Sequence, residues 1–198
     1  MKFLFYFPIY ILSSFIIQIF ICLPIYAGDF QKGVDAANNG DYATAYNEWR
    51  PLAEQGDPSS QFNLGWMYVN GYGVIQDYKE AANWYLKSAE QGIAEAQLEI
   101  GLMYNEGKGV IQDEITAANW FLKSAEQGNA QAQYNLGWFY TARNIIYAHM
   151  WWNIAAFNGY PYAAELRDIR AEEMSLSQIE EAQTLARECL EKNYKGCI

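Results

Sequence analysis

The sequence contains few of the side chains that carry chemistry, with one histidine and three cysteines among 198 residues. A metal centre needs several ligands at close spacing, and His149 with the distant Cys189 and Cys197 supplies no such set. Because His149 lies beside Trp151 and Trp152 in a predicted helix, we expect it to pack against a neighbouring helix rather than to act as a general base. No pair of carboxylates marks a catalytic cleft. These absences predict a protein that is not an enzyme and that binds no cofactor and no metal.

Positive charge is also scarce, since 13 Lys and Arg stand against 23 Asp and Glu, for a formal net charge of −10. Proteins that bind nucleic acid or anionic membrane surfaces neutralise phosphates with Lys and Arg, so this balance argues against both functions. A neutral or basic protein or peptide is the partner that fits. Hydrophobic residues make up 52% of the chain and charged residues 18%, which argues against disorder.

The N-terminus is set apart by an almost unbroken apolar run from Phe3 to Tyr26, preceded by Lys2 and followed by the small residue Ala27. This order is typical of a cleaved signal peptide. We therefore predict that residues 1–27 are a signal peptide, that the mature chain begins at Gly28, and that the protein is periplasmic or secreted. The run is close to the ~20 residues that span a bilayer, so an uncleaved membrane anchor is the alternative.

Beyond this leader, the sequence repeats itself every 36 residues, with the segments QFNLGWMY, QLEIGLMY and QYNLGWFY beginning at Gln61, Gln97 and Gln133. Within the segments, the repeated residues fall at i, i+3, i+4 and i+7, the stripe of a helix that packs on its neighbours. A glycine, Gly65 in the first segment, recurs inside the stripe. Because glycine costs about 1 kcal/mol in a helix interior, its recurrence indicates that two helices approach too closely there for a side chain.

Each segment precedes a second predicted helix, so each unit is a helix hairpin. Asp77 can cap the second helix of the first unit, and Gly92, Gly128 and Gly159 stand where second helices must end in a left-handed residue. The last unit is five residues shorter and lacks the glycine loop. The predicted divisions are a capping hairpin at 28–57, repeats at 58–93 and 94–129, a shortened repeat at 130–160, and closing helices at 161–198.

Residues 94–128 match nearly all of the pattern AxAQxxLGxxYxxGxGVxxDxxxAxxWxxxAAxxG, and on these residues the chain resembles the Sel-1-like repeat family, relatives of tetratricopeptide repeats. The segments Gly40–Gly56 and Ala148–Ala156 extend the likeness over the chain after the leader, and Ser88 and Ser124 depart from it by replacing an alanine. The resemblance implies an all-α fold, a right-handed α-solenoid of antiparallel helix hairpins. It also implies an adaptor in protein complexes, often at the bacterial envelope.

Cys189 and Cys197 would remain after the leader is removed, and in an oxidising compartment we expect them to form a disulfide. A continuous helix would hold their Cα atoms ~12 Å apart, beyond the ~7 Å limit, so the helix must stop, and Gly196 supplies the break. Two free thiols or an intermolecular bond are the alternatives. Some secreted members of the family staple helix pairs with cysteines at this spacing and have a proposed β-lactam-binding activity; here a single pair shows the spacing.

The expected binding surface is the concave face, along the first helices of the hairpins. Placing the repeated stripe on the packing face of tetratricopeptide helices turns bulky apolar pairs inward, and Trp66 and Trp138 stand out as binding anchors. The alternative is that neighbouring helices bury these rings. The predicted partner-binding residues are Phe62, Trp66, Val69, Asn70, Leu98, Leu102, Asn105, Glu106, Tyr134, Trp138 and Thr141.

These features together predict a protein–protein interaction scaffold in the bacterial cell envelope or secreted from the cell. The alternative is a cell-wall protein that binds or hydrolyses peptidoglycan or binds β-lactams, since aromatic rings also stack on sugars.

Overall fold

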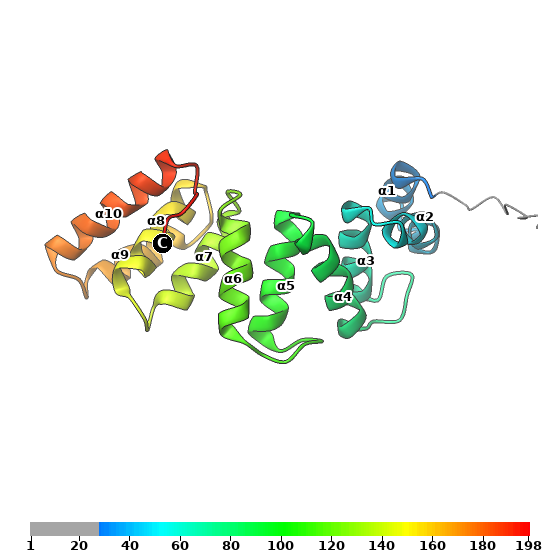
Figure 1. The fold of residues 1–198 in the computed structure, drawn as a ribbon, viewed down its shortest axis with the longest axis horizontal. Helices are drawn as coiled ribbons and strands as arrows, with labels where there is room; N and C mark the ends of the chain where they lie inside the picture. Colours follow the sequence, from blue (N-terminus) through cyan, green and yellow to red (C-terminus); the bar gives the residue numbers. More distant parts are fainter. Residues whose placement is uncertain (1–27) are drawn as a thin grey trace, which may run out of the picture.

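The computed structural model describes residues 28–198, and within this part of the chain it contains ten helices and no strand (Figure 1). Each helix from α1 to α8 packs against the next, and α10 returns to pack against α8. The predicted all-α solenoid of helix hairpins is confirmed, whereas the predicted signal peptide, residues 1–27, lies outside the described residues. The helices are α1 (Phe30–Asn38), α2 (Tyr42–Glu54), α3 (Pro58–Asn70), α4 (Tyr78–Glu90), α5 (Ala94–Glu106), α6 (Glu114–Ala125), α7 (Ala130–Tyr140), α8 (Ile145–Phe157), α9 (Ala163–Ala171) and α10 (Leu176–Glu191).

Each of the first four hairpins is closed by a glycine on its first helix that lies against an aromatic ring on its second helix. A Cβ atom at Gly65 would lie 2.5 Å from the ring of Tyr85, and one at Gly101 would lie 2.7 Å from the ring of Phe121. Both separations are well inside van der Waals contact, so the close helix approach predicted from the recurring glycine is confirmed. The four pairs are Gly33–Trp49, Gly65–Tyr85, Gly101–Phe121 and Gly137–Trp152.

Buried amides join one hairpin to the next. Gln61 Nε2 donates to the backbone oxygen of Ala53 over 3.0 Å, and Gln61 Oε1 accepts from Gln91 Nε2 over 2.7 Å. Gln97 and Gln133 repeat the backbone contact in the following units. Since a buried polar group is costly unless it is hydrogen-bonded, these contacts explain why a glutamine opens each repeated segment.

The two serines that depart from the family pattern also hold hairpins together. Ser88 Oγ donates to the backbone oxygen of Pro58 over 2.8 Å, and Ser124 Oγ donates to that of Ala94 over 2.7 Å. Both serines are buried. The departure from alanine therefore adds a satisfied hydrogen bond between the two helices of the hairpin.

The hairpins differ in how their first helix ends. Helix α3 ends at Gly71 with a φ of 71°, and a second glycine, Gly73, lies so near α2 that a Cβ atom would be 2.6 Å from the backbone oxygen of Tyr42. The same two-glycine loop follows α5. Helix α7 instead ends at Thr141 in a right-handed conformation, and Asn144 caps α8 directly. The third repeat thus turns without the glycine loop, and its turn contacts the preceding hairpin through an ion pair between Arg143 and Glu114 on α6.

The closing end is fastened by a disulfide between Cys189 and Cys197, whose Cα atoms lie 5.0 Å apart. The chain reverses beyond α10 through three left-handed residues, Asn193 and Tyr194 with φ values of 50° and 67°, and Gly196, the predicted break, with a φ of 60°. The hydroxyl of Tyr194 donates to Asn158 Oδ1 over 2.9 Å, so the tail is also tied to the end of α8.

Candidate partner-binding groove

Three hollows lie between successive first helices of the hairpins. The first, about 420 Å³, lies between α1 and α3; the second, about 210 Å³, between α3 and α5; and the third, about 270 Å³, between α5 and α7. Because α3, α5 and α7 are equivalent helices of the repeat, the hollows follow one another along the row of hairpins, and we call them together the groove. Each contains the same two repeat positions, occupied by Asn63 and Trp66, by Glu99 and Leu102, and by Asn135 and Trp138.

Most of the predicted partner-binding residues line this groove. The lining members of that set are Phe62, Trp66, Val69, Leu102, Asn105, Glu106 and Trp138.

The remaining four predicted residues lie outside the lining. Leu98 is only 6% exposed and belongs to the apolar cluster around Phe121, so it packs rather than presents a surface. Tyr134 packs on Tyr160, with ring centroids 4.6 Å apart. Asn70 and Thr141 donate hydrogen bonds to backbone oxygens of their own helices. A role for any of these residues in binding a partner stays a prediction.

Sequence reasoning missed the residue three positions before each of Trp66, Leu102 and Trp138. These residues are Asn63, Glu99 and Asn135, and each lines one hollow. The signal was present, because residues at i and i+3 share a helix face and these three positions recur with the period of the repeat.

Glu99 is the unusual member of the groove. It is half-buried, and it has no hydrogen bond or ion pair to any residue in the described part of the chain. Burial, and secondly the negative charge of Glu106, raise the pKa of the Glu99 carboxyl above its ordinary value. Glu106 itself is paired with Lys108 over 2.6 Å. The middle hollow therefore contains a carboxylate that has no ion-pair partner within residues 28–198, because Lys108, which lines the same hollow, is paired with Glu106.

The third hollow contains another unsatisfied polar group. The Nδ2 atom of Asn135 is buried without a hydrogen-bond partner among the described residues. Beside it, Arg143 pairs with Glu114 over 2.8 Å and lies 4.1 Å from the ring centroid of Phe139. Buried amide donors are nearly always paired, so this unpaired donor is unusual.

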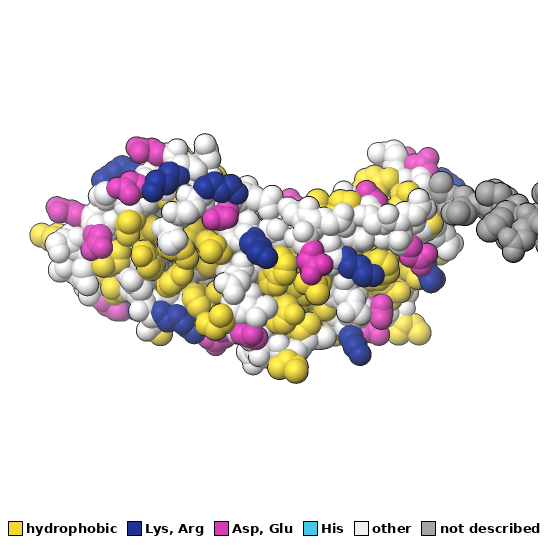
Figure 2. All heavy atoms as spheres, viewed as in Figure 1, with side chains coloured by type: hydrophobic (Ala, Val, Ile, Leu, Met, Phe, Trp, Pro, Cys, Tyr) yellow, Lys and Arg dark blue, Asp and Glu magenta, His cyan; other side chains and the backbone are white. Residues whose placement is uncertain are grey.

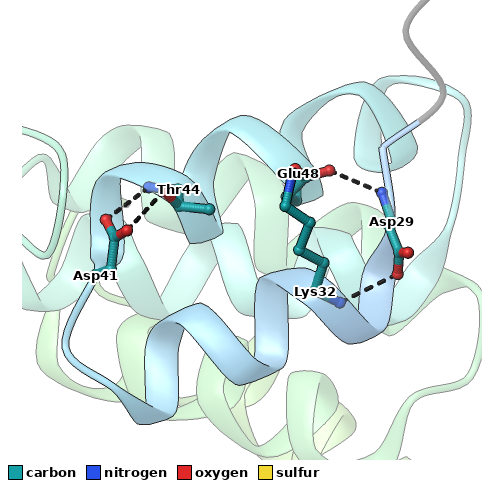
Figure 3. A network of polar contacts seen from close by, with 5 residues as sticks. All are labelled: Asp29, Lys32, Asp41, Thr44 and Glu48. Atoms are coloured by element: carbon teal, nitrogen blue, oxygen red, sulfur yellow. Dashed lines mark hydrogen bonds and ion pairs between the residues drawn. The ribbon is translucent and has the colours of Figure 1, made fainter.

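The first wall of the groove is fixed by a polar network shown in Figure 3. Glu48 on α2 is 2% exposed and accepts hydrogen bonds from the backbone nitrogen of Asp29, over 3.0 Å, and from Lys32 Nζ, over 2.5 Å. Asp41 caps α2 through Thr44. The contacts of Glu48 hold α1 against α2, so α1 can serve as a wall of the first hollow.

The surface of the molecule is mixed rather than uniformly acidic. On the face drawn in Figure 2, patches of hydrophobic side chains extend over several hairpins, and positive and negative side chains are scattered among them. Within residues 28–198, no cluster of three His, Cys, Asp or Glu could hold a metal ion, and no helix has the length and apolar character to cross a membrane.

Comparisons with known proteins agree with this geometry. The family model described as Sel1 repeat matches residues 58–93, 94–129 and 130–160. No curated protein matches the chain.

Two solved structures are similar over most of the chain. One is a protective antigen present in uropathogenic Escherichia coli strains, displaying an SLR fold, with 28% identity and a TM-score of 0.70 over 83% of this chain and 41% of that one. The other is a Sel1 repeat protein from Oxalobacter formigenes, with 26% identity and a TM-score of 0.65 over 84% of this chain and 78% of that one. The chain thus spans less than half the length of the Escherichia coli antigen.

Proposed function

We propose, from the premise that this chain belongs to the Sel1 repeat family, that it is an interaction scaffold holding a segment of another protein in the groove. Sel1 repeat proteins are generally protein–protein interaction scaffolds. The observation that carries the proposal is the row of three equivalent hollows between successive first helices, with tryptophans lining the two outer ones. A continuous track of this kind suits an extended chain, because each hollow can take one side chain.

The groove favours a partner segment with a basic residue between two apolar residues. Trp66 and Trp138 line the outer hollows, and large partly exposed rings are typical binding anchors. Glu99 in the middle hollow lacks a cationic partner among the described residues. A lysine or arginine of the partner would supply that charge, which agrees with the net charge of −10 of the chain.

We further propose that the scaffold works in an oxidising compartment outside the cytoplasm. The disulfide between Cys189 and Cys197 supports this location, because such bonds persist mainly in exported proteins. The apolar segment at residues 3–26, predicted to be part of a signal peptide, agrees with it.

The test uses fluorescent synthetic peptides in which two tryptophans flank one variable residue, Lys, Gln or Glu, with Gly/Ser spacers of graded length. We expect the Lys peptide to bind wild-type protein about tenfold more tightly than the Glu peptide. Trp138→Ala should weaken binding of all peptides, whereas Phe157→Ala, which removes an exposed ring on α8, should not.

A second pair of variants distinguishes the preference for a basic residue from binding in the groove itself. Glu99→Gln should abolish the preference for Lys while keeping the dependence on Trp138, and Glu95→Gln on the exposed side of the same helix should change neither. Absence of binding to every peptide, combined with retention on purified peptidoglycan, would overturn the scaffold proposal in favour of a wall-binding protein.

A further inference from the structure

A fourth hollow, of about 440 Å³, lies at the closing end of the molecule, between α8, α9 and α10. It shares no residue with the groove. Its polar lining is His149 and Asn153 from α8, Arg167 and Asp168 from α9, and Gln183 and Arg187 from α10, and its apolar lining is Ala171 and Ile179.

His149 is the buried polar residue of this hollow. The side chain is 2% exposed, yet its Nδ1 atom has no hydrogen-bond partner among the described residues. Buried polar atoms in proteins are nearly always paired, so an unpaired imidazole nitrogen in the wall of a hollow is a position that a ligand or an ordered water can satisfy. Burial, followed by the positive charge of Arg167, lowers the pKa of the His149 imidazole, so the ring is neutral near pH 7.

The charge of the hollow is opposite to that of the chain. The hollow contains two guanidinium groups and one carboxylate, Asp168, which is paired with Arg167 over 2.7 Å. Arg167 Nη1 also donates to Asn153 Oδ1 over 3.2 Å, so Arg167 is held by its neighbours. Arg187 donates from Nη2 to Thr184 Oγ1 over 2.9 Å and has no carboxylate within ion-pair distance among residues 28–198. In a chain of net charge −10, this hollow therefore contains an uncompensated cation.

We infer that this hollow binds a small organic anion, with its carboxylate or phosphate group held by the guanidinium of Arg187 and near the positive charge of Arg167. The planar guanidinium fork donates two parallel hydrogen bonds to either group. The body of the ligand would lie against Ile179 and Ala171, since a hollow of about 440 Å³ holds more than an inorganic ion. His149 and Gln183 supply further hydrogen bonds from the wall.

The experiment uses the fact that the chain contains a single histidine, so the ring of His149 gives one set of NMR signals. Protein with ¹⁵N-labelled histidine is titrated with succinate, with glycerol phosphate and with the neutral succinamide, at constant ionic strength. We expect a saturable shift of the His149 signals with at least one of the two anions and none with succinamide. The anion that gives the tighter fit identifies the preferred group.

Arg187→Gln should weaken anion binding at least tenfold, and Arg187→Lys, which keeps the charge and loses the fork, should weaken it less. Lys192→Gln is the matched control, because it removes an exposed charge just beyond the same helix, and it should bind as wild type. Circular dichroism verifies that each variant folds. Equal shifts with succinamide, no shift with either anion, or equal affinity in wild type and folded Arg187→Gln would overturn the inference.

Discussion

The first and third repeats have a tryptophan at the same position but surround it differently. Trp66 packs against Tyr42 and against Tyr72 of the glycine loop, with ring centroids 6.0 and 5.0 Å apart, and it is half-buried. Trp138 has Glu114 at the position of Tyr42, and because its loop is missing it has no counterpart of Tyr72. It is 49% exposed. A shortened loop and one substitution thus uncover a ring that the first repeat covers.

This difference shows that the same position of the repeat can pack inside the solenoid in one repeat and form an exposed surface in another. Whether a ring mainly stabilises the solenoid or mainly offers a surface is decided by the neighbours that the loop and the preceding hairpin supply. We therefore expect Trp66 to matter more for folding and Trp138 more for binding.

The largest effect is expected where the two repeats are alike, at the glycine that meets an aromatic ring. Gly65→Leu and Gly137→Leu should each lower the free energy of unfolding by about 3 to 4 kcal/mol, because the new side chain overlaps Tyr85 or Trp152. Chemical denaturation measures the loss, and Asn83→Leu on the exposed face of α4 is the control. A small loss at Gly137 alone would show that the third repeat closes differently from the first.

The second prediction compares the two ends of the solenoid. The opening hairpin is held by the Lys32–Glu48 pair, whereas the closing end is held by a covalent bond. Cys197→Ser should lower the free energy of unfolding by about 2 to 3 kcal/mol, because the short closed loop no longer restricts the unfolded chain. Reductant added to the unmodified protein should reproduce the loss, and thiol titration without reductant should find no free thiol. Two reactive thiols would contradict the bond.

The third prediction tests the two tryptophans directly. Trp66→Ala should cost about 2 kcal/mol of stability, since its ring is half-buried against Tyr42 and Tyr72. Trp138→Ala should cost about 1 kcal/mol or less, because its ring contacts Tyr134 and Trp152 but is 49% exposed. Affinity for the two-tryptophan Lys peptide should fall in both variants. Thermal melts measure the loss of stability in each variant. Equal losses of stability would mean that the missing loop does not uncover Trp138.

The sequence predicted the fold well because its signals were periodic. The 36-residue repeat, the glycine inside the helix stripe and the left-handed glycines at helix ends each correspond to a contact or a backbone angle that the structure contains. The break predicted at Gly196 is present, with a φ of 60°, but Asn193 and Tyr194 also adopt left-handed angles, which their side chains gave no reason to expect.

The groove was predicted less completely. Leu98 and Trp138 were both predicted to contact a partner, yet Leu98 is 6% exposed and Trp138 is 49% exposed. Their exposure depends on which residues of the loops and neighbouring hairpins fill the space, and a single helix pattern does not contain that information. The hollow around His149 could not be foreseen, because its lining comes from three helices of which two lie beyond the repeats.

The smallest expected effect concerns the middle hollow, which differs from the two outer ones by containing a carboxylate. The pKa of the Glu99 carboxyl is raised in the folded state above its ordinary value of 4.5, so the ionised group lowers stability at neutral pH. It has no such effect once it is protonated in both the folded and the unfolded states. Glu99→Gln should therefore raise the melting temperature at pH 7 by on the order of 1 °C, and the difference should vanish as the pH falls below about 4.5.

Glu95→Gln, on the same helix but exposed, should show no such gain. When the Lys peptide is bound, wild type should have a higher melting temperature than Glu99→Gln. The cation of the peptide then favours ionised Glu99, so the peptide stabilises wild type more than the glutamine variant. If the glutamine variant stays more stable with the peptide bound, Glu99 makes no contact with the basic residue. Trp66 and Trp138 in the outer hollows would then be the residues that recognise the peptide, and the charge in the middle hollow would contribute nothing to binding.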